Sequence, residues 1–185
     1  MFLLTGTTDE LAKKIPGCFV VHSPVRGAHA HPGMEDGLKT FTKYIGVPDV
    51  HRDTIDKMKP KLEAALAFVP DFHYAKAKES ELAKLVSTTL YGLSIAAITD
   101  ISKTCNELNI NFDDVFTTWQ ETYNSGVMKQ GRMHAIRPVL APTTDDKIGG
   151  HCVIPNARLL QNLMPSLANF VLRYDDTKEG SNNSE

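Results

Sequence analysis

The strongest constraint on this chain is a set of mostly apolar side chains that recur every three or four residues between positions 82 and 108. They are Leu82, Leu85, Val86, Thr89, Leu93, Ala96, Ile101, Cys105 and Leu108. Because an α-helix repeats every 3.6 residues, this spacing places them on one helical face. We therefore predict one amphipathic helix of about thirty residues, whose apolar face is buried against other elements.

The residues before this helix alternate between short apolar runs and helical patterns. Strands are predicted at 18–22, 42–46 and 71–74. A short helix, capped by Thr or Asp, is predicted within residues 5–14 and is closed by Pro16-Gly17; a helical turn is predicted at 35–41 and a helix at 54–66 with a kink at Pro60. Strand alternating with helix is typical of an α/β unit.

Further helices are predicted after the long helix. Asn111 is a cap for a helix that ends near Gly126. Its aromatic residues are expected to pack in the core; they are Phe112, Phe116, Trp119 and Tyr123. Residues 127–150 lack a period and form a long connection, and a last helical region follows Pro155 and restarts after Pro165.

These patterns predict an α+β fold. Short strands of a partial Rossmann-like α/β unit, residues 1–75, precede a mainly α-helical domain with one long central helix, residues 76–174. The polar tail, residues 175–185, is expected to be disordered.

Composition narrows the classes of function. Among 185 residues, 20 are basic and 22 acidic, so the charge gives no support for binding to nucleic acid. No apolar run approaches the ~20 residues that cross a bilayer, so we expect no membrane partner and a cytoplasmic location. Cys18 and Cys105 are interpreted as buried core residues.

The sharpest local feature is Gly149-Gly150-His151-Cys152, which stands shortly before Pro155 and a predicted helix. A thiol at the positive end of a helix dipole favours the thiolate, which is the nucleophilic form. The alternative is that Cys152 is a small buried side chain at a turn.

Three other positions could take part in binding or catalysis. Lys84 precedes Thr88 by one helical turn, so both project from one face, although a lysine there is also typical of a solvated surface. Arg26 and Arg137 lie in loops flanked by Gly or Pro, where a guanidinium could reach a phosphate or carboxylate. The alternative for both arginines is again a solvated surface.

His29 and His31 raise a metal-binding hypothesis, because paired histidines are common zinc ligands. No carboxylate or cysteine stands at a spacing that would complete the site, so we favour loop histidines without a metal.

Three segments, in this order, resemble the UDP-glucose/GDP-mannose dehydrogenases, the family of nucleotide-sugar 6-dehydrogenases. Residues 21–27, followed by 43–46, resemble the end of that family's cofactor domain. Residues 80–85, Ser-Glu-Leu-Ala-Lys-Leu, resemble its Ala-Glu-Leu-x-Lys motif, and residues 149–152 resemble its catalytic Gly-Gly-(Ser/His)-Cys loop. The resemblance covers roughly residues 5–165.

The resemblance implies NAD-dependent oxidation of the C6 alcohol of a sugar nucleotide to the carboxylate. Cys152 would form a thiohemiacetal and then a thioester, and Lys84 would stabilise the oxyanion. Thr88 and Asn156 stand where the family has its other catalytic residues. The implied substrate-binding residues are Arg26, Arg137, Gly149, Gly150 and His151. A homodimer through the long helix is also implied.

Several positions depart from the family pattern. Val25 replaces a Glu, Thr88 replaces an Asn, and Asn156 replaces an Asp. No Gly-x-Gly-x-x-Gly loop is present to hold a dinucleotide. We therefore expect a truncated or divergent homologue that obtains NAD from a separate NAD-binding polypeptide. The alternative is a non-catalytic dimerisation or ligand-binding module derived from the family.

Overall fold

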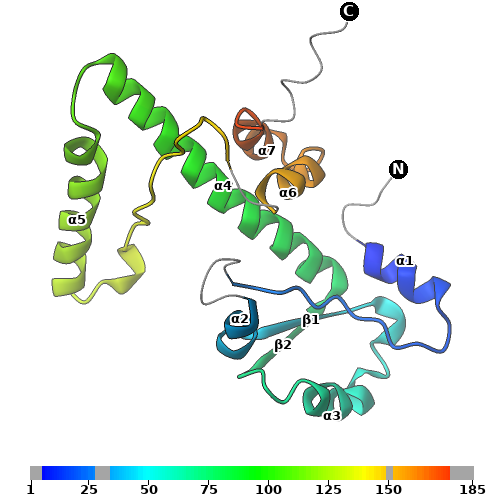
Figure 1. Cartoon of the computed structure of the whole chain (residues 1–185). Coiled ribbons are helices and arrows are strands. Elements are labelled where there is room, and N and C mark those ends of the chain that lie inside the picture. The colour runs from blue at the N-terminus through cyan, green and yellow to red at the C-terminus, as the bar shows by residue number, and fades with distance from the viewer. Residues whose placement is uncertain (1–5, 28–33, 149–151, 176–185) are drawn as a thin grey trace, which may run out of the picture. The chain divides into compact units, whose positions relative to one another are not determined.

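The computed structural model describes residues 6–27, 34–148 and 152–175 (Figure 1). The chain divides into two compact units, residues 1–86 and 87–185. That division falls inside the long helix. The predicted domain limits at residues 75 and 174 stay a prediction.

The first unit contains a two-stranded parallel sheet. Strand β1, Lys43–Val47, pairs with β2, Phe72–Lys76, with Lys43 opposite Phe72. The chain crosses between them through the 3-10 helix η1, Asp49–His51, and through helix α3, Ile55–Ala65. Helix α3 continues past Pro60, which lies in its interior.

The short helix predicted before Pro16 and the helical turn predicted at 35–41 are both confirmed. Helix α1 is Thr7–Lys14 and α2 is Met34–Thr40.

The strand predicted at 18–22 is wrong. Within the described residues, this segment joins the sheet through one antiparallel bridge, in which His22 and Gly46 exchange hydrogen bonds of 2.8 and 2.7 Å. The N–H of Val20 donates to Nε2 of His51 at 3.2 Å and not to the carbonyl of a neighbouring strand. Cys18 is exposed, so its assignment to the core is also wrong.

The long helix is confirmed as α4, Ala77–Glu107, with 31 residues. It ends where Asn109 takes a positive φ of 52° and the N–H of Ile110 bonds to the carbonyl of Cys105 at 2.9 Å. Cys105 itself is buried, as predicted. By length and composition α4 could cross a membrane, but core helices of soluble proteins meet the same criterion.

The second unit is built of helices. After α4, a π-helical turn, η2, Asp113–Thr117, leads into α5, Thr118–Lys129, and a 3-10 turn, η3, spans Met133–Ala135. Helices α6, Val153–Leu160, and α7, Pro165–Leu172, follow the long connection. Their core with α4 consists of Ala96, Ile148, Val153, Ile154, Ala157, Val171, Leu172 and Tyr174. The predicted α+β fold with one long central helix is therefore confirmed.

The predicted cap at Asn111 is confirmed, since its Oδ1 accepts the N–H of Asp113 at 2.8 Å. The expected packing of the aromatic side chains of this helix in the core is not confirmed. Phe116 is buried, but Trp119 is 66% exposed. Because the helix turns through a π segment before Thr118, Phe116 and Trp119 do not share one buried stripe.

Candidate functional site

Cys152 lies at the N-terminal end of α6. It occupies the N-cap position of that helix, it is half-buried, and its carbonyl accepts the N–H of Asn156 at 3.1 Å. Cys152 therefore lies at the positive end of the helix dipole, the position predicted for it. Gly149, Gly150 and His151, the predicted substrate-binding residues before it, lie outside the described residues.

Close packing of α6 on α4 positions the Cys152 backbone. Val153, Ala157 and Leu160 are buried on the inner face of α6. Gly92 of α4 makes this contact possible, because a Cβ at that position would lie 2.3 Å from Cγ1 of Val153. Cys152 therefore directly precedes a helix that can pack closely on α4 because residue 92 has no side chain.

The connection that leads to Cys152 is also anchored. The N–H of Thr143 donates to the Oγ1 of Thr99, a buried side chain of α4, at 3.0 Å. Ile148 is buried, and its N–H donates to the carbonyl of Tyr174 at 3.2 Å. The chain on both sides of residues 149–151 is therefore fixed to the core of this unit.

Lys84 lies in the first unit, on α4, and is half-buried. Its Nζ donates to the carbonyl oxygen of Val25 at 3.3 Å. Lys84 is thus held against the segment 23–26 and is not a freely solvated side chain.

Arg26 closes the same segment. Its guanidinium lies 5.3 Å from the ring centroid of Tyr44 and 5.7 Å from that of Phe41, which are cation–π distances. The side chain is exposed, so it could meet an anionic ligand, which is the role predicted for it.

Arg137 is held by α5. Its guanidinium lies 3.8 Å from the ring centroid of Tyr123, and Asn124 bonds both its N–H and its carbonyl, at 2.9 and 2.8 Å. Its predicted contact with substrate stays a prediction.

The predicted catalytic residues are divided between the two units. Lys84 belongs to residues 1–86, whereas Thr88, Cys152 and Asn156 belong to residues 87–185 and are all half-buried. Lys84 and Thr88 are one turn apart on the continuous helix α4. The approach of the Lys84 ammonium to the Cys152 thiol stays a prediction.

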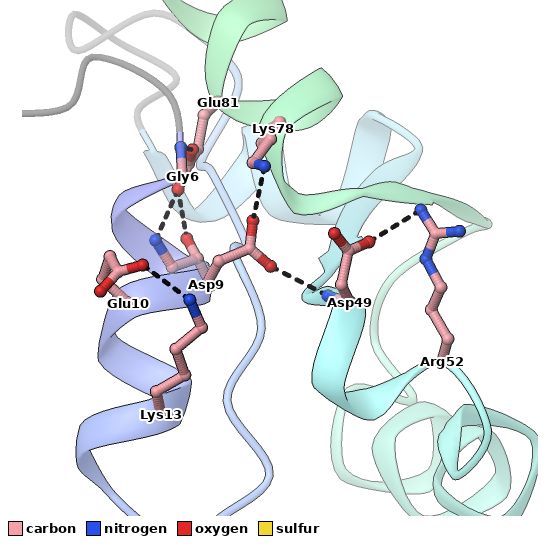
Figure 2. Close-up of polar contacts among 9 residues, drawn as sticks. Gly6, Asp9, Glu10, Lys13, Asp49, Arg52, Lys78 and Glu81 are labelled. Carbon is pink, nitrogen blue, oxygen red and sulfur yellow. Dashed lines mark hydrogen bonds and ion pairs between the residues drawn. The ribbon is translucent and has the colours of Figure 1, made fainter.

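Glu81, the acidic residue of the Glu-Leu-Ala-Lys segment, caps another helix. Its carboxylate accepts the backbone N–H of Gly6 at 2.5 Å, just before α1 (Figure 2). It also accepts the N–H and the hydroxyl of Thr8, in the first turn of α1, at 2.8 and 2.5 Å. Burial raises the pKa of Glu81, but these hydrogen bonds outweigh burial and leave the pKa below 4.5. Glu81 is therefore a structural residue that ties α4 to α1.

Asp9 makes a second tie beside it. Its Oδ1 accepts the N–H of Asp49 at 2.9 Å, and its Oδ2 lies 3.8 Å from Nζ of Lys78 (Figure 2). Helix α1 is therefore fixed to both η1 and the start of α4.

Two residues near Lys84 were not predicted from the sequence to be catalytic or to bind substrate. Lys43 is 7% exposed, and its Nζ donates to the carbonyls of Ser23 and Pro24 at 3.3 and 3.2 Å. Nδ1 of His22 lies 2.9 Å from Oγ of Ser80, and burial lowers the pKa of this imidazole below 6.5. A lysine that opens a strand gives no sequence signal for burial.

The described residues give no support for a metal or for NAD bound by this chain alone. Among them, no group of three His, Cys, Asp or Glu side chains could hold a metal ion, and His29 and His31 lie outside them. The first unit offers two parallel strands, and the sequence has no glycine-rich loop to approach a pyrophosphate, so these residues do not fit the dinucleotide.

Comparison with solved structures finds a similarity over most of the chain. The chain is similar to the UDP-N-acetyl-mannosamine dehydrogenase Cap5O from S. aureus, with 28% sequence identity over 86% of this chain and a TM-score of 0.48. That protein is a nucleotide-sugar dehydrogenase, the family that the three sequence segments resemble. The chain spans 35% of its length. No protein-family model matches, and no curated protein matches.

Proposed function

We propose that this chain is a divergent nucleotide-sugar dehydrogenase homologue in which Cys152 supplies the reactive thiol. The observation that carries the proposal is the place of Cys152: it is half-buried at the N-terminus of α6, directly after the segment that resembles the family's catalytic loop. A cysteine used for packing alone does not need this position beside the helix dipole.

In the proposed chemistry, the Cys152 thiolate adds to the carbonyl carbon of the sugar C6 aldehyde. A sulfur–carbon bond forms, and the carbonyl oxygen takes up the negative charge, which the Lys84 ammonium would stabilise. Oxidation of this adduct yields a thioester, and water releases the carboxylate and regenerates the thiol. Asn156 cannot act as a general base, so we do not assign it the activation of that water.

The oxidations of the alcohol and of the adduct need a hydride acceptor, which NAD bound by a separate polypeptide would supply. Arg26 is the best-placed described residue for an anionic group of the sugar nucleotide, since it is exposed and supported on two rings. We place the protein in the cytoplasm, where such substrates occur, and propose a homodimer through α4.

The direct test mixes the purified protein with NAD and UDP-glucose, GDP-mannose or UDP-N-acetylmannosamine. Each mixture is assayed alone and with proteins encoded beside this one, and NADH absorbance is followed. Cys152→Ser should abolish NADH formation, whereas Cys18→Ser, at an exposed cysteine, should leave it unchanged. Silence in every mixture would refute the enzymatic proposal.

The second candidate is a non-catalytic dimerisation or ligand-binding module. It is favoured by the substitutions at Val25, Thr88 and Asn156 and by exposed apolar side chains on η2 and α5, such as Trp119 at 66% and Met128 at 50%. Thiol labelling separates the candidates. A catalytic Cys152 should react faster than the more exposed Cys18, and a module predicts the opposite order.

A further inference from the structure

Lys43 is the most unusual buried charge in the first unit. Its side chain opens β1 and is 7% exposed, yet among the described residues its Nζ forms no ion pair. Burial lowers the pKa of this amine, because a site with little water disfavours the charged form. A methionine would fill similar space without that penalty, so the ammonium must be retained for its hydrogen bonds.

Those hydrogen bonds all go to one short segment. Lys43 Nζ binds the carbonyls of Ser23 and Pro24, and Lys84 Nζ binds the next carbonyl, that of Val25. Two lysines from different elements therefore bind three successive carbonyl oxygens.

The ends of the segment are fixed as well. At its start, His22 is bridged to Gly46. At its end, Gly27 has a φ of 125°, and a Cβ on Gly37 would lie 2.6 Å from the carbonyl oxygen of Arg26. Lys43 thus supplies the hydrogen bonds in the middle of a segment whose two ends are already set by the backbone.

We propose that Lys43 is a positioning residue, which holds the segment 23–25 so that the Val25 carbonyl fixes the ammonium of Lys84. The role of Lys84 in the reaction rests on the proposed function, but its fixation by Lys43 does not. The other titratable groups beside this cluster are His22 and Glu81, since the His22 imidazole interacts electrostatically with Glu81, Lys43 and Lys84.

The test compares Lys43→Met with Lys43→Arg and with Lys39→Met, a matched change at an exposed lysine of α2. Two rates are measured by mass spectrometry: acylation of the Lys84 amine and trypsin cleavage after Arg26. Loss of hydrogen bonds of this kind predicts that Lys43→Met raises both rates by about fivefold. Lys43→Arg should restore both to within about twofold, and Lys39→Met should change neither.

Cleavage after Arg52, which pairs with Asp49 outside the segment, reports general loosening of the unit. Equal acceleration at Arg26 and Arg52, or an unchanged Lys84 rate in Lys43→Met, would overturn the proposal. If Lys43→Met does not fold, Lys43→Gln retains one donor group and should give an intermediate rise at Lys84; no rise there would also overturn it.

Enzyme assays separate this proposal from the proposed function. If NADH forms, Lys43→Met should lower kcat by a larger factor than it changes KM, because Lys84 would act on the oxyanion and not on the bound substrate. If no mixture forms NADH, the proposed function fails, while the acylation and cleavage rates still decide the role of Lys43.

Discussion

Replacement of Glu81 by Gln tests whether one carboxylate of α4 holds α1 in place. The carboxylate accepts three hydrogen bonds, from the N–H of Gly6 and from the N–H and hydroxyl of Thr8. Glutamine has the same shape but one acceptor oxygen, so its NH₂ group must face at least one buried donor. We expect the first turn of α1 to open much more often in Glu81→Gln.

The magnitude follows from these contacts. A buried donor left without an acceptor costs about 1–3 kcal/mol, and the bonds that remain lose the extra strength that a charged acceptor gives. The sum is about 2–4 kcal/mol, which corresponds to a fall of roughly 30- to 1,000-fold in protection from exchange. Glu79→Gln is the matched control, because exposed Glu79 accepts one N–H, from Lys76 at 2.9 Å, and glutamine can still accept it.

Hydrogen exchange of the α1 amides, followed by mass spectrometry, measures the effect locally. Because the folded-state pKa of Glu81 lies below 4.5, its stabilisation is complete above that pH and is lost as the pH falls through the lowered pKa. Glu81→Gln should lack this loss. If Glu81→Gln and Glu79→Gln exchange within about twofold of each other, the assignment of Glu81 as the cap of α1 is refuted.

Three further outcomes are expected. Gly92→Ala should destabilise the second unit by about 1–3 kcal/mol or more, because the new methyl would lie 2.3 Å from Val153 Cγ1. Urea unfolding followed by circular dichroism measures this loss. Gly126→Ala is the control and should not destabilise the unit, because no atom lies within 4 Å of its added Cβ. Tyr74 should ionise with a pKa of about 12, because burial and its hydrogen bond to Glu63 raise this pKa. In a titration followed by tyrosinate absorbance, the ionisation step near this pH should be lost in Tyr74→Phe. An unchanged titration curve would contradict the assignment. Burial lowers the pKa of His22 below 6.5, so the unfolded chain binds the proton more readily than the folded chain. The first unit should therefore lose stability as the pH falls below 6.5, and this loss should be smaller in His22→Gln. An equal dependence of the unfolding free energy on pH in both proteins would contradict the prediction.

Elements with a long, regular pattern were predictable from the sequence. Helix α4 was predictable because apolar residues recur at helical spacing from Leu82 to Cys105, and the cap at Asn111 marks the start of the next helix. The prediction of a strand at 18–22 was wrong because an apolar run indicates extended backbone, but it does not indicate whether a neighbouring strand is available for pairing.

The place of Cys152 in the fold was predictable, but its role was not tested. Glycines and a following helix leave a local signal, and Cys152 does lie at the N-cap of α6, while its part in a reaction stays a prediction. The partners of Lys84 were not predictable, because the carbonyls of residues 23–25 and the Lys43 ammonium meet through tertiary contacts that no local spacing records. Trp119 was placed in the core because aromatic residues usually are, but a π turn rotates it outward.

The outward position of Trp119 decides what tryptophan fluorescence can report. It is the one tryptophan in the sequence, and it is already 66% exposed. Its emission should therefore change little when the chain unfolds, but should shift to the blue when another molecule covers α5. The intrinsic fluorophore of this protein is thus a sensor of association and a poor probe of folding.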